Sequence, residues 1–165
     1  MNKKDISDLK ELKLFAAFDD ATLAEFLKAF SRRELRKGEV IFREGEEGST
    51  FYIVLCGEIA IEKRLDKAGT KWRKLAVLKR GEYFGEMAVL EGKPRFAQAR
   101  AITPSEVIEI ERARLMQFIS DYPREGAAML IQILLVMLHR LRHTSDDLMA
   151  AHGFMEVLAK YSHKR

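Results

Sequence analysis

The stretch that decides the fold is Gly81 to Ala101, which reads GEYFGEMAVLEGKPRFAQARA. It consists of a glycine-punctuated turn (Gly81 to Gly85), a short apolar run suited to one helical turn (Glu86 to Leu90), and a second turn (Gly92 to Arg95). A loop that enters a helix leaves backbone N–H groups without partners, and these groups favour an anion. The stretch therefore predicts a turn, a short helix and a turn that together form an anion site.

Two charged side chains of this stretch suit a sugar phosphate. The guanidinium of Arg95 can give a phosphate two parallel hydrogen bonds, and the carboxylate of Glu86 can accept from a sugar hydroxyl. An ordinary glycine turn closed by a Glu86–Arg95 ion pair is the alternative. The phosphate loop of a nucleoside triphosphatase is excluded, because the Gly-Lys-Ser/Thr ending is missing and Lys93 precedes Pro94.

The segments Phe84 to Leu90 and Pro94 to Ala97 resemble the phosphate-binding cassette of cyclic nucleotide-binding domains. The resemblance implies that Glu86 holds the ribose 2′-hydroxyl, with Gly85 beside it, and that Arg95 holds the exocyclic oxygens of the cyclic phosphate. It also implies that backbone amides complete the phosphate cup, namely those of Gly85, Ala88, Phe96 and Ala97.

Phe96 departs from the family pattern. The family usually carries Ala, Ser or Thr after the arginine, and a hydroxyl at this position can bond the phosphate or a guanine. A benzyl group cannot donate a hydrogen bond, so Phe96 could narrow the pocket, stack on the base or swing out. This departure leaves the choice of base open, and it makes a domain that has lost its ligand an alternative.

The composition indicates one ordinary domain. A chain of 165 residues can bury a core, and a net charge of +4 does not by itself indicate nucleic acid. The single Cys56 excludes an internal disulfide and favours a reducing cytosol. The N-terminus lacks an apolar signal core, and the run Met129 to Leu138 is too short to span a bilayer. We therefore expect a cytoplasmic protein without a membrane partner.

The pattern along the chain predicts a mainly β fold with flanking helices. Residues Ile6 to Phe18 and a segment capped by Asp19 or Asp20 have helical apolar spacing. Eight of the ten glycines fall between Gly38 and Gly92, which favours about eight short strands joined by tight turns. We predict an antiparallel double-stranded β-helix, a jelly-roll-like β-roll. The predicted divisions are N-terminal helices 1–32, β-roll 33–111 with its cassette 81–101, and C-terminal helices 112–165.

The last predicted helix spans residues 123–151 and begins at Pro123. One apolar stripe along it has the alternating spacing of four and three that is typical of coiled coils: Leu130, Leu134, Met137, Leu141, Thr144, Leu148 and Ala151. A second stripe comprises Ala127, Ile131, Leu135 and Leu138. We interpret one stripe as packing on the roll and the other as the seam of a two-fold homodimer. A monomer whose helix is packed on two sides is the alternative.

The segment Arg140 to Leu148 is similar to the dimerisation helix of the bacterial catabolite activator protein family. In that family adjacent Thr and Ser side chains touch the adenine amino group, one from each subunit. The resemblance implies a bacterial protein in which Thr144 contacts the base of its own subunit and Ser145 the base across the dimer. A polar break in the seam is the alternative.

Neither a metal site nor a catalytic site is expected. His139 and His143 share a helical face but have no evident third ligand, and the spacing of Glu44, Glu46 and Glu47 does not match a calcium loop. No nucleophile–base pair lies near the cassette, so a phosphodiesterase is not favoured and we predict that the protein is not an enzyme.

The sequence thus predicts a cytosolic regulatory protein that binds a cyclic purine nucleotide, cAMP rather than cGMP, as a homodimer. It would signal through its C-terminal helices to an unknown downstream protein, with no cofactor other than this ligand. A ligand-free dimeric interaction module is one alternative. The other is a DNA-binding regulator of the catabolite activator type. Only residues 152–165 follow the last helix, too few for a helix-turn-helix, so no DNA contact is expected unless the full-length protein continues further.

Overall fold

The computed structural model describes residues 9–66 and 71–162. The strands are β1 (Ser31–Leu35), β2 (Val40–Phe42), β3 (Thr50–Cys56), β4 (Ile59–Arg64), β5 (Trp72–Leu78), β6 (Tyr83–Phe84), β7 (Gln98–Ala101) and β8 (Ser105–Glu111). The helices are the 3-10 helix η1 (Lys13–Phe15) and the α-helices α2 (Asp20–Leu27), α3 (Glu86–Glu91), α4 (Arg112–Asp121) and α5 (Pro123–Ser162).

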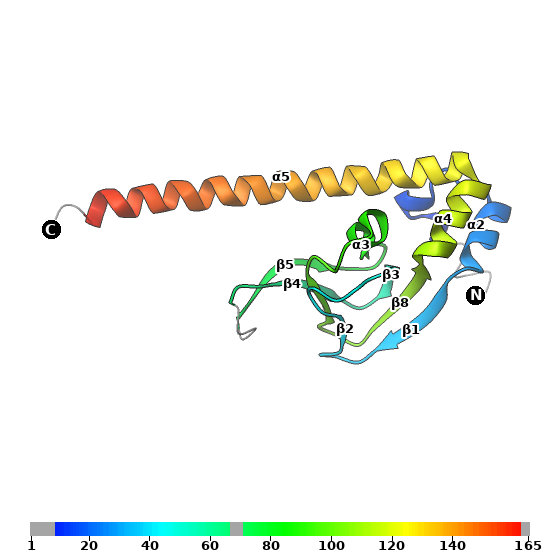
Figure 1. Ribbon diagram of the computed structural model, residues 1–165, viewed down its shortest axis with the longest axis horizontal. Coiled ribbons are helices and arrows are strands. Elements are labelled where there is room, and N and C mark those ends of the chain that lie inside the picture. The colour runs from blue at the N-terminus through cyan, green and yellow to red at the C-terminus, as the bar shows by residue number, and fades with distance from the viewer. Residues whose placement is uncertain (1–8, 67–70, 163–165) are drawn as a thin grey trace.

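The eight strands form two four-stranded antiparallel sheets, in the orders β1-β8-β3-β6 and β2-β7-β4-β5. One apolar core fills the space between the sheets and takes side chains from both: Leu35, Tyr52, Val54, Ile59, Leu78, Phe84, Ala99, Ala101 and Val107. The predicted mainly β fold, with helices before and after a β-roll, is confirmed. Figure 1 shows the roll below a long C-terminal helix.

A second core joins the helices to the β1-β8-β3-β6 sheet. Phe118 of α4 stacks on Phe18 at a centroid distance of 5.6 Å and lies 4.0 Å from the ring of Phe26 in α2. The side chain of Asp19 caps α2 by accepting from the backbone N–H of Thr22 at 2.7 Å, as predicted. Helices α2 and α4 therefore have a packing role, and they hold the start of α5 in place.

The N-terminal segment differs from the predicted helix over Ile6 to Phe18, part of which lies outside the described residues. In its described part Leu9 and Lys10 are helical, the helix then breaks, and η1 follows, with tight turns on either side in which Leu12 N–H donates to Leu9 O and Phe18 N–H to Phe15 O. Successive turns of this kind bury the same apolar residues without a continuous helix. Two strands also differ. β1 begins at Ser31, before the predicted start of the roll, and β6 forms within the predicted glycine turn because it pairs with β3.

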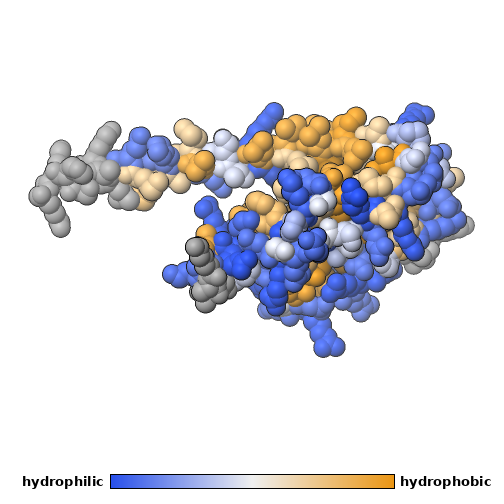
Figure 2. Space-filling view, viewed as in Figure 1, coloured by the Kyte–Doolittle hydropathy of each residue, from blue (hydrophilic) through white to orange (hydrophobic). Residues whose placement is uncertain are grey.

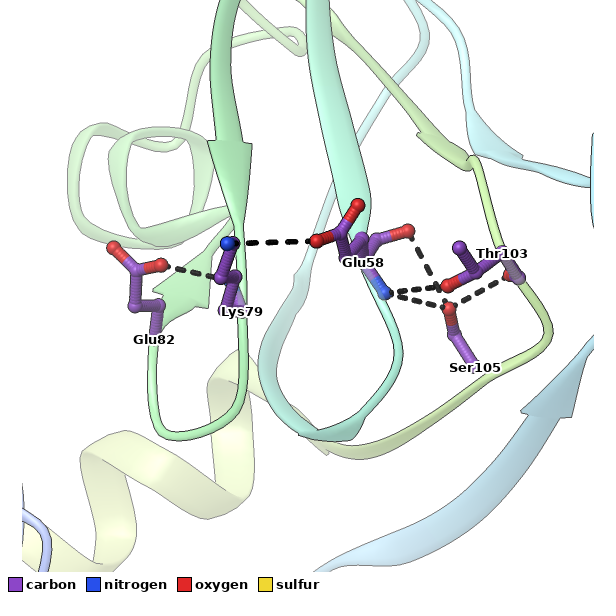
Figure 3. Close-up of polar contacts among 5 residues, drawn as sticks. All are labelled: Glu58, Lys79, Glu82, Thr103 and Ser105. Carbon is purple, nitrogen blue, oxygen red and sulfur yellow. Dashed lines mark hydrogen bonds and ion pairs between the residues drawn. The ribbon is translucent and has the colours of Figure 1, made fainter.

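The turn between β3 and β4 shows how the open strand ends are fixed. Gly57 adopts a φ of +82°, and a Cβ there would lie 2.2 Å from Ser105 Oγ, so the position requires glycine. The backbone N–H of Glu58 donates to Thr103 Oγ1 at 2.9 Å and to Ser105 Oγ at 3.1 Å, and Lys79 pairs with the Glu58 carboxylate (Figure 3). Three neighbouring turns are thereby tied together, which fixes the start of β4.

Helix α5 lies across the top of the roll and continues well past it (Figure 1). It begins at Pro123 as predicted but ends at Ser162, beyond the predicted end at Ala151. Figure 2 shows apolar residues gathered along the upper side of α5 where it passes over the roll. Residues 141–156 are all exposed. None of the helices in residues 9–66 and 71–162 combines the length and apolar character of a membrane span.

The apolar residues of α5 divide between body and solvent differently from the two predicted stripes. Leu130 and Met137 are partly buried against the body, whereas Leu134, predicted in the same stripe, is 55% exposed. The first predicted stripe is therefore wrong as a single packed face, whereas all four residues of the second stripe are exposed. The docked face is centred on Met129 and Ile133, which are fully buried and belong to neither stripe.

Candidate functional site

The predicted turn, helix and turn over residues 81–101 forms around Gly85. This glycine caps α3 with a φ of +82°, and a Cβ there would lie 2.8 Å from both Arg95 Nη1 and Thr50 O. The first bond of α3 runs from Val89 N–H to Gly85 O, so the N–H groups before Val89 precede the helical hydrogen-bond ladder. Ala88, on this first turn, is buried. Glycine at position 85 thus permits the close approach of the arginine to the turn.

Arg95 is a buried cation without a paired carboxylate in the described part of the chain. It is 5% exposed, its Cζ lies 4.1 Å from the centroid of the Phe42 ring, and Nη1 donates to Gly85 O at 3.2 Å. Its Nε has no hydrogen-bond partner. Burial lowers the pKa of Arg95 below its ordinary value, yet an arginine stays protonated. An unpaired buried charge is costly, so this guanidinium favours an incoming anion.

The backbone around Arg95 holds the guanidinium in place. Arg95 N–H donates to Glu46 O at 2.8 Å, and Gly45 N–H donates to Arg95 O at 2.9 Å. A Cβ at Gly48 would lie 2.1 Å from Arg95 Nε, so the turn before β3 closes over the side chain. The turn from Glu44 to Gly48 therefore forms one wall of the site.

Glu86 pairs with Arg140 of α5, a partner that we did not predict. Arg140 Nη1 donates to Glu86 Oε1 at 2.9 Å, and Nη2 donates to Tyr83 O at 3.0 Å. Glu86 is 4% exposed; burial raises the pKa of its carboxyl, and Arg140 opposes the rise. The alternative of a Glu86–Arg95 ion pair is wrong. No pattern in the sequence marks this pair, because the contact depends on which face of α5 docks on the body.

We expect Arg140→Met to lower the free energy of unfolding at neutral pH by about 2 kcal/mol. This value is below that of a fully buried pair because Arg140 is one-third exposed. The pKa of Glu86 is raised in the folded state, so stability falls as pH rises through the window above 4.5. Without Arg140 this pKa rises further, so the deficit should be small near pH 4.5 and grow toward neutral pH.

Urea unfolding across this pH range measures the effect of Arg140→Met, with Glu86→Gln in the same background as the control. Removing the carboxylate should restore most of the stability and abolish the pH dependence of the deficit. A deficit that does not change with pH would show that Arg140 stabilises the fold through its packing alone.

The other predicted site residues fall into two groups. Ala97 is buried beside Arg95, whereas Phe96 is 51% exposed. Thr144 and Ser145 lie on the exposed part of α5, where Thr144 Oγ1 donates to Arg140 O at 2.9 Å. Thr144 follows Arg140 by four residues and so shares the helix face that reaches Glu86, whereas Ser145 lies on another face. The structure thus brings the cassette residues together and leaves the two hydroxyls outside it.

Within residues 9–66 and 71–162, no group of three His, Cys, Asp or Glu side chains could hold a metal ion. His139 and His143 contact each other edge to face at 5.0 Å between ring centroids, on exposed α5 positions. The side chain of Glu44 accepts from Arg64 N–H and pairs with Lys63. These side chains therefore give no reason to revise the expectation of a metal-free site.

The antiparallel β-roll buries Glu86 and an arginine that has no paired carboxylate among the described residues, and these are charges that a sugar phosphate would require. Residues 32–122 match the profile of the family described as "Cyclic nucleotide-binding domain". The chain belongs to this family.

The proteins to which the chain is similar include regulators. The chain is 27% identical over 135 residues to the CRP-like cAMP-activated global transcriptional regulator of Mycobacterium tuberculosis. The matched region covers 82% of this chain and 58% of that protein. It is 34% identical to the cAMP-dependent protein kinase regulatory subunit of Mycosarcoma maydis, over 56% of this chain and 17% of that protein. The crystal structure of Thermus thermophilus Catabolite Activator Protein superposes with a TM-score of 0.71 at 30% identity, over 82% of this chain and 62% of that one. The chain thus spans about three-fifths of the transcriptional regulator and of the Thermus protein.

Proposed function

We propose that this chain is a non-catalytic regulatory receptor that binds a cyclic nucleotide, cAMP in preference to cGMP. The observation that carries the proposal is the buried Arg95 guanidinium, whose Nε lacks a partner and whose charge lacks a counter-ion among the described residues. A cyclic phosphate supplies both, because its exocyclic oxygens accept from the planar guanidinium fork. The preference for cAMP rests on the Thr144 and Ser145 hydroxyls, which can accept from the adenine amino group. The names of some relatives refer to cAMP and those of others to cGMP, so the relatives support a cyclic nucleotide without choosing its base.

In this proposal the ribose of the ligand binds to Glu86, the second buried charged residue of the site. Arg140 occupies Oε1 of Glu86, and an ionised carboxylate has further acceptor sites for a ribose 2′-hydroxyl. Gly85, which precedes Glu86, allows Arg95 to approach the same turn closely, so the ribose and phosphate contacts lie side by side. The N–H groups of Ala88, Phe96 and Ala97 complete the phosphate cup in this proposal.

Arg140 connects the binding site to α5. The same guanidinium bonds the Glu86 side chain and the Tyr83 carbonyl, so a ribose on Glu86 changes the surroundings of a residue anchored on α5. Ligand shifts the position of α5 only if it binds one arrangement of this contact more tightly than another. In this proposal the signal leaves the domain through α5 toward a separate partner.

The exposed apolar face of α5 supports a homodimer. The seam that this face forms takes residues from both predicted stripes. Its positions alternate in spacing between four and three, as in a coiled coil. We define this seam by Ala127, Ile131, Leu134, Leu138, Leu141, Ser145 and Leu148. Its leucines are 41–69% exposed, which is unusual for a side chain that meets only water. Ser145 lies on this seam and Thr144 on the face toward Glu86, so the placement supports a base contact from each subunit.

Thermal unfolding with cAMP, cGMP and linear AMP tests the receptor function. If the site binds with a micromolar dissociation constant, a millimolar concentration of cAMP stabilises the fold by about 4 kcal/mol. We expect the midpoint to rise by roughly 8–16 °C with cAMP, less with cGMP and little with AMP, which lacks the cyclic phosphate. If none of the three nucleotides moves the midpoint, the receptor proposal fails and a ligand-free interaction module takes its place.

A further inference from the structure

Phe96 stands out in the cassette because its side chain is exposed between two buried neighbours. Its exposed fraction is 51%, against 5% for Arg95 and 6% for Ala97. The guanidinium of Arg95 lies over the Phe42 ring, whereas the Phe96 ring contacts Lys63. An aromatic ring therefore stands at the edge of the phosphate cup without closing it.

Lys63 of β4 holds this ring in position. Its Nζ lies 3.9 Å from the centroid of the Phe96 ring and donates to the Phe96 carbonyl oxygen at 2.5 Å. Lys63 is itself fixed by the carboxylate of Glu44 at 3.3 Å. A cation over one face of an aromatic ring attracts it electrostatically, so Phe96 has a defined orientation although it is half exposed.

The register of the sheet shows which way Lys63 faces. Ile59 pairs with Ala101 and Ile61 with Ala99, and both isoleucines contact the core between the sheets. Side chains alternate along a strand, so Lys63 continues the row of Ile59 and Ile61. The last pair of this ladder is Glu62 with Gln98, and the Lys63 side chain reaches the Phe96 carbonyl just before it. Lys63 and the Phe96 ring that it contacts thus lie at the open end of the roll interior, next to the phosphate cup.

We infer that the Phe96 ring, oriented by Lys63, is a shelf on which the base of the bound cyclic nucleotide stacks. The inference rests on the proposed function and extends it to the base side of the ligand. One ribose joins base to phosphate, so a base whose phosphate lies on Arg95 is within reach of the next side chain. Lys63 covers one face of the ring, and half of the side-chain surface remains open.

A stacking shelf gives affinity without choosing between bases, because every base has a π-face. Phe96 has no donor or acceptor on its side chain, so it reads no base edge. Discrimination between adenine and guanine then falls to the hydroxyls of Thr144 and Ser145. The replacement of a small or hydroxyl residue by Phe96 thus changes the kind of recognition at this position, from hydrogen bonding to stacking.

Phe96→Leu tests the shelf, with affinities measured by calorimetry for cAMP, cGMP and a ribose cyclic phosphate that lacks a base. Leucine keeps the apolar volume and removes the π-face. We expect cAMP and cGMP each to bind about ten-fold more weakly, with their ratio unchanged, and the baseless ligand to bind as in the wild type. Phe96→Tyr should bind all three as the wild type does.

Two further variants separate the shelf from general effects. Lys63→Gln releases the ring and should weaken cAMP binding about three-fold without affecting the baseless ligand. Leu65→Ala removes another exposed apolar side chain and should change nothing. The shelf is refuted if Phe96→Leu binds cAMP as well as or better than the wild type, or if the baseless ligand loses as much as cAMP. A wild-type protein that binds none of the three ligands refutes the receptor function itself, and the shelf with it.

Discussion

Arg95→Ala is expected to weaken cyclic nucleotide binding by at least about a hundred-fold while leaving the fold intact. Hydrogen bonds to charged groups contribute about 1.5–3 kcal/mol each, and the guanidinium fork supplies two of them to the phosphate. The fold loses little, because Arg95 has no ion-pair partner among the described residues and only one side-chain hydrogen bond, to Gly85 O. Removing an unpaired buried charge also removes its desolvation cost.

Arg100→Ala is the matched control for Arg95→Ala, because Arg100 follows in the same strand region but serves the fold. Arg100 Nε and Nη2 bond both carboxylate oxygens of Glu62, at 3.0 and 2.5 Å, and lower the pKa of that carboxyl. We expect Arg100→Ala to reduce the free energy of unfolding by about 2 kcal/mol, as for the equally exposed Arg140, and to leave cAMP affinity unchanged. The two variants should therefore separate binding from stability.

Calorimetric titration and thermal unfolding of both arginine variants decide the phosphate role. Arg95→Lys adds a graded comparison, since lysine keeps the charge but loses the fork and should bind with intermediate affinity. An Arg95→Ala protein that is folded and binds cAMP with wild-type affinity would remove Arg95 from the phosphate cup. Loss of folding in Arg95→Ala, with Arg95→Lys binding normally, would point to a structural role instead.

The local part of the site could be predicted because its chemistry is local. Gly85, Glu86 and Arg95 lie within one short stretch, where turn residues and spacing constrain the backbone directly. Arg140 could not be predicted in the same way. It is 54 residues from Glu86 in the chain, and their contact depends on where α5 docks. The 3.6-residue period of a helix reveals apolar faces, but it does not say which face meets the body.

The register of α5 illustrates this limit. Sequence spacing grouped Leu134 with Leu130 and Met137, because a four–three repeat can be drawn through all three. Packing decides otherwise, since the outer face of the sheet and the aromatic cluster of α2 and α4 bury Met129 and Ile133. Once Met129 and Ile133 face the body, the helical period determines which way every other residue of α5 faces. The exposed seam then passes through Leu134 but not through Met137.

Leu134→Lys is expected to convert a dimer into monomers, because it places two ammonium groups opposite each other in an apolar two-fold seam. An unpaired charge buried in such a seam costs several kcal/mol, enough to dissociate the dimer at micromolar concentrations. Leu134 is 55% exposed within the subunit, so the fold itself should tolerate lysine. Sedimentation velocity of both proteins gives the result directly.

His143→Lys is the matched control on the same helix, because His143 is exposed and lies on the side of α5 opposite the seam. It should remain dimeric, and a Leu134→Lys protein that also remains dimeric would move the interface to another surface. The monomer then tests the base contact of Ser145. If Ser145 reaches the base across the dimer, Leu134→Lys weakens cAMP binding but leaves the affinity for the baseless ribose cyclic phosphate unchanged. Equal affinity for cAMP in monomer and dimer would instead confine the whole binding site to one subunit, with Thr144 as the hydroxyl for the base.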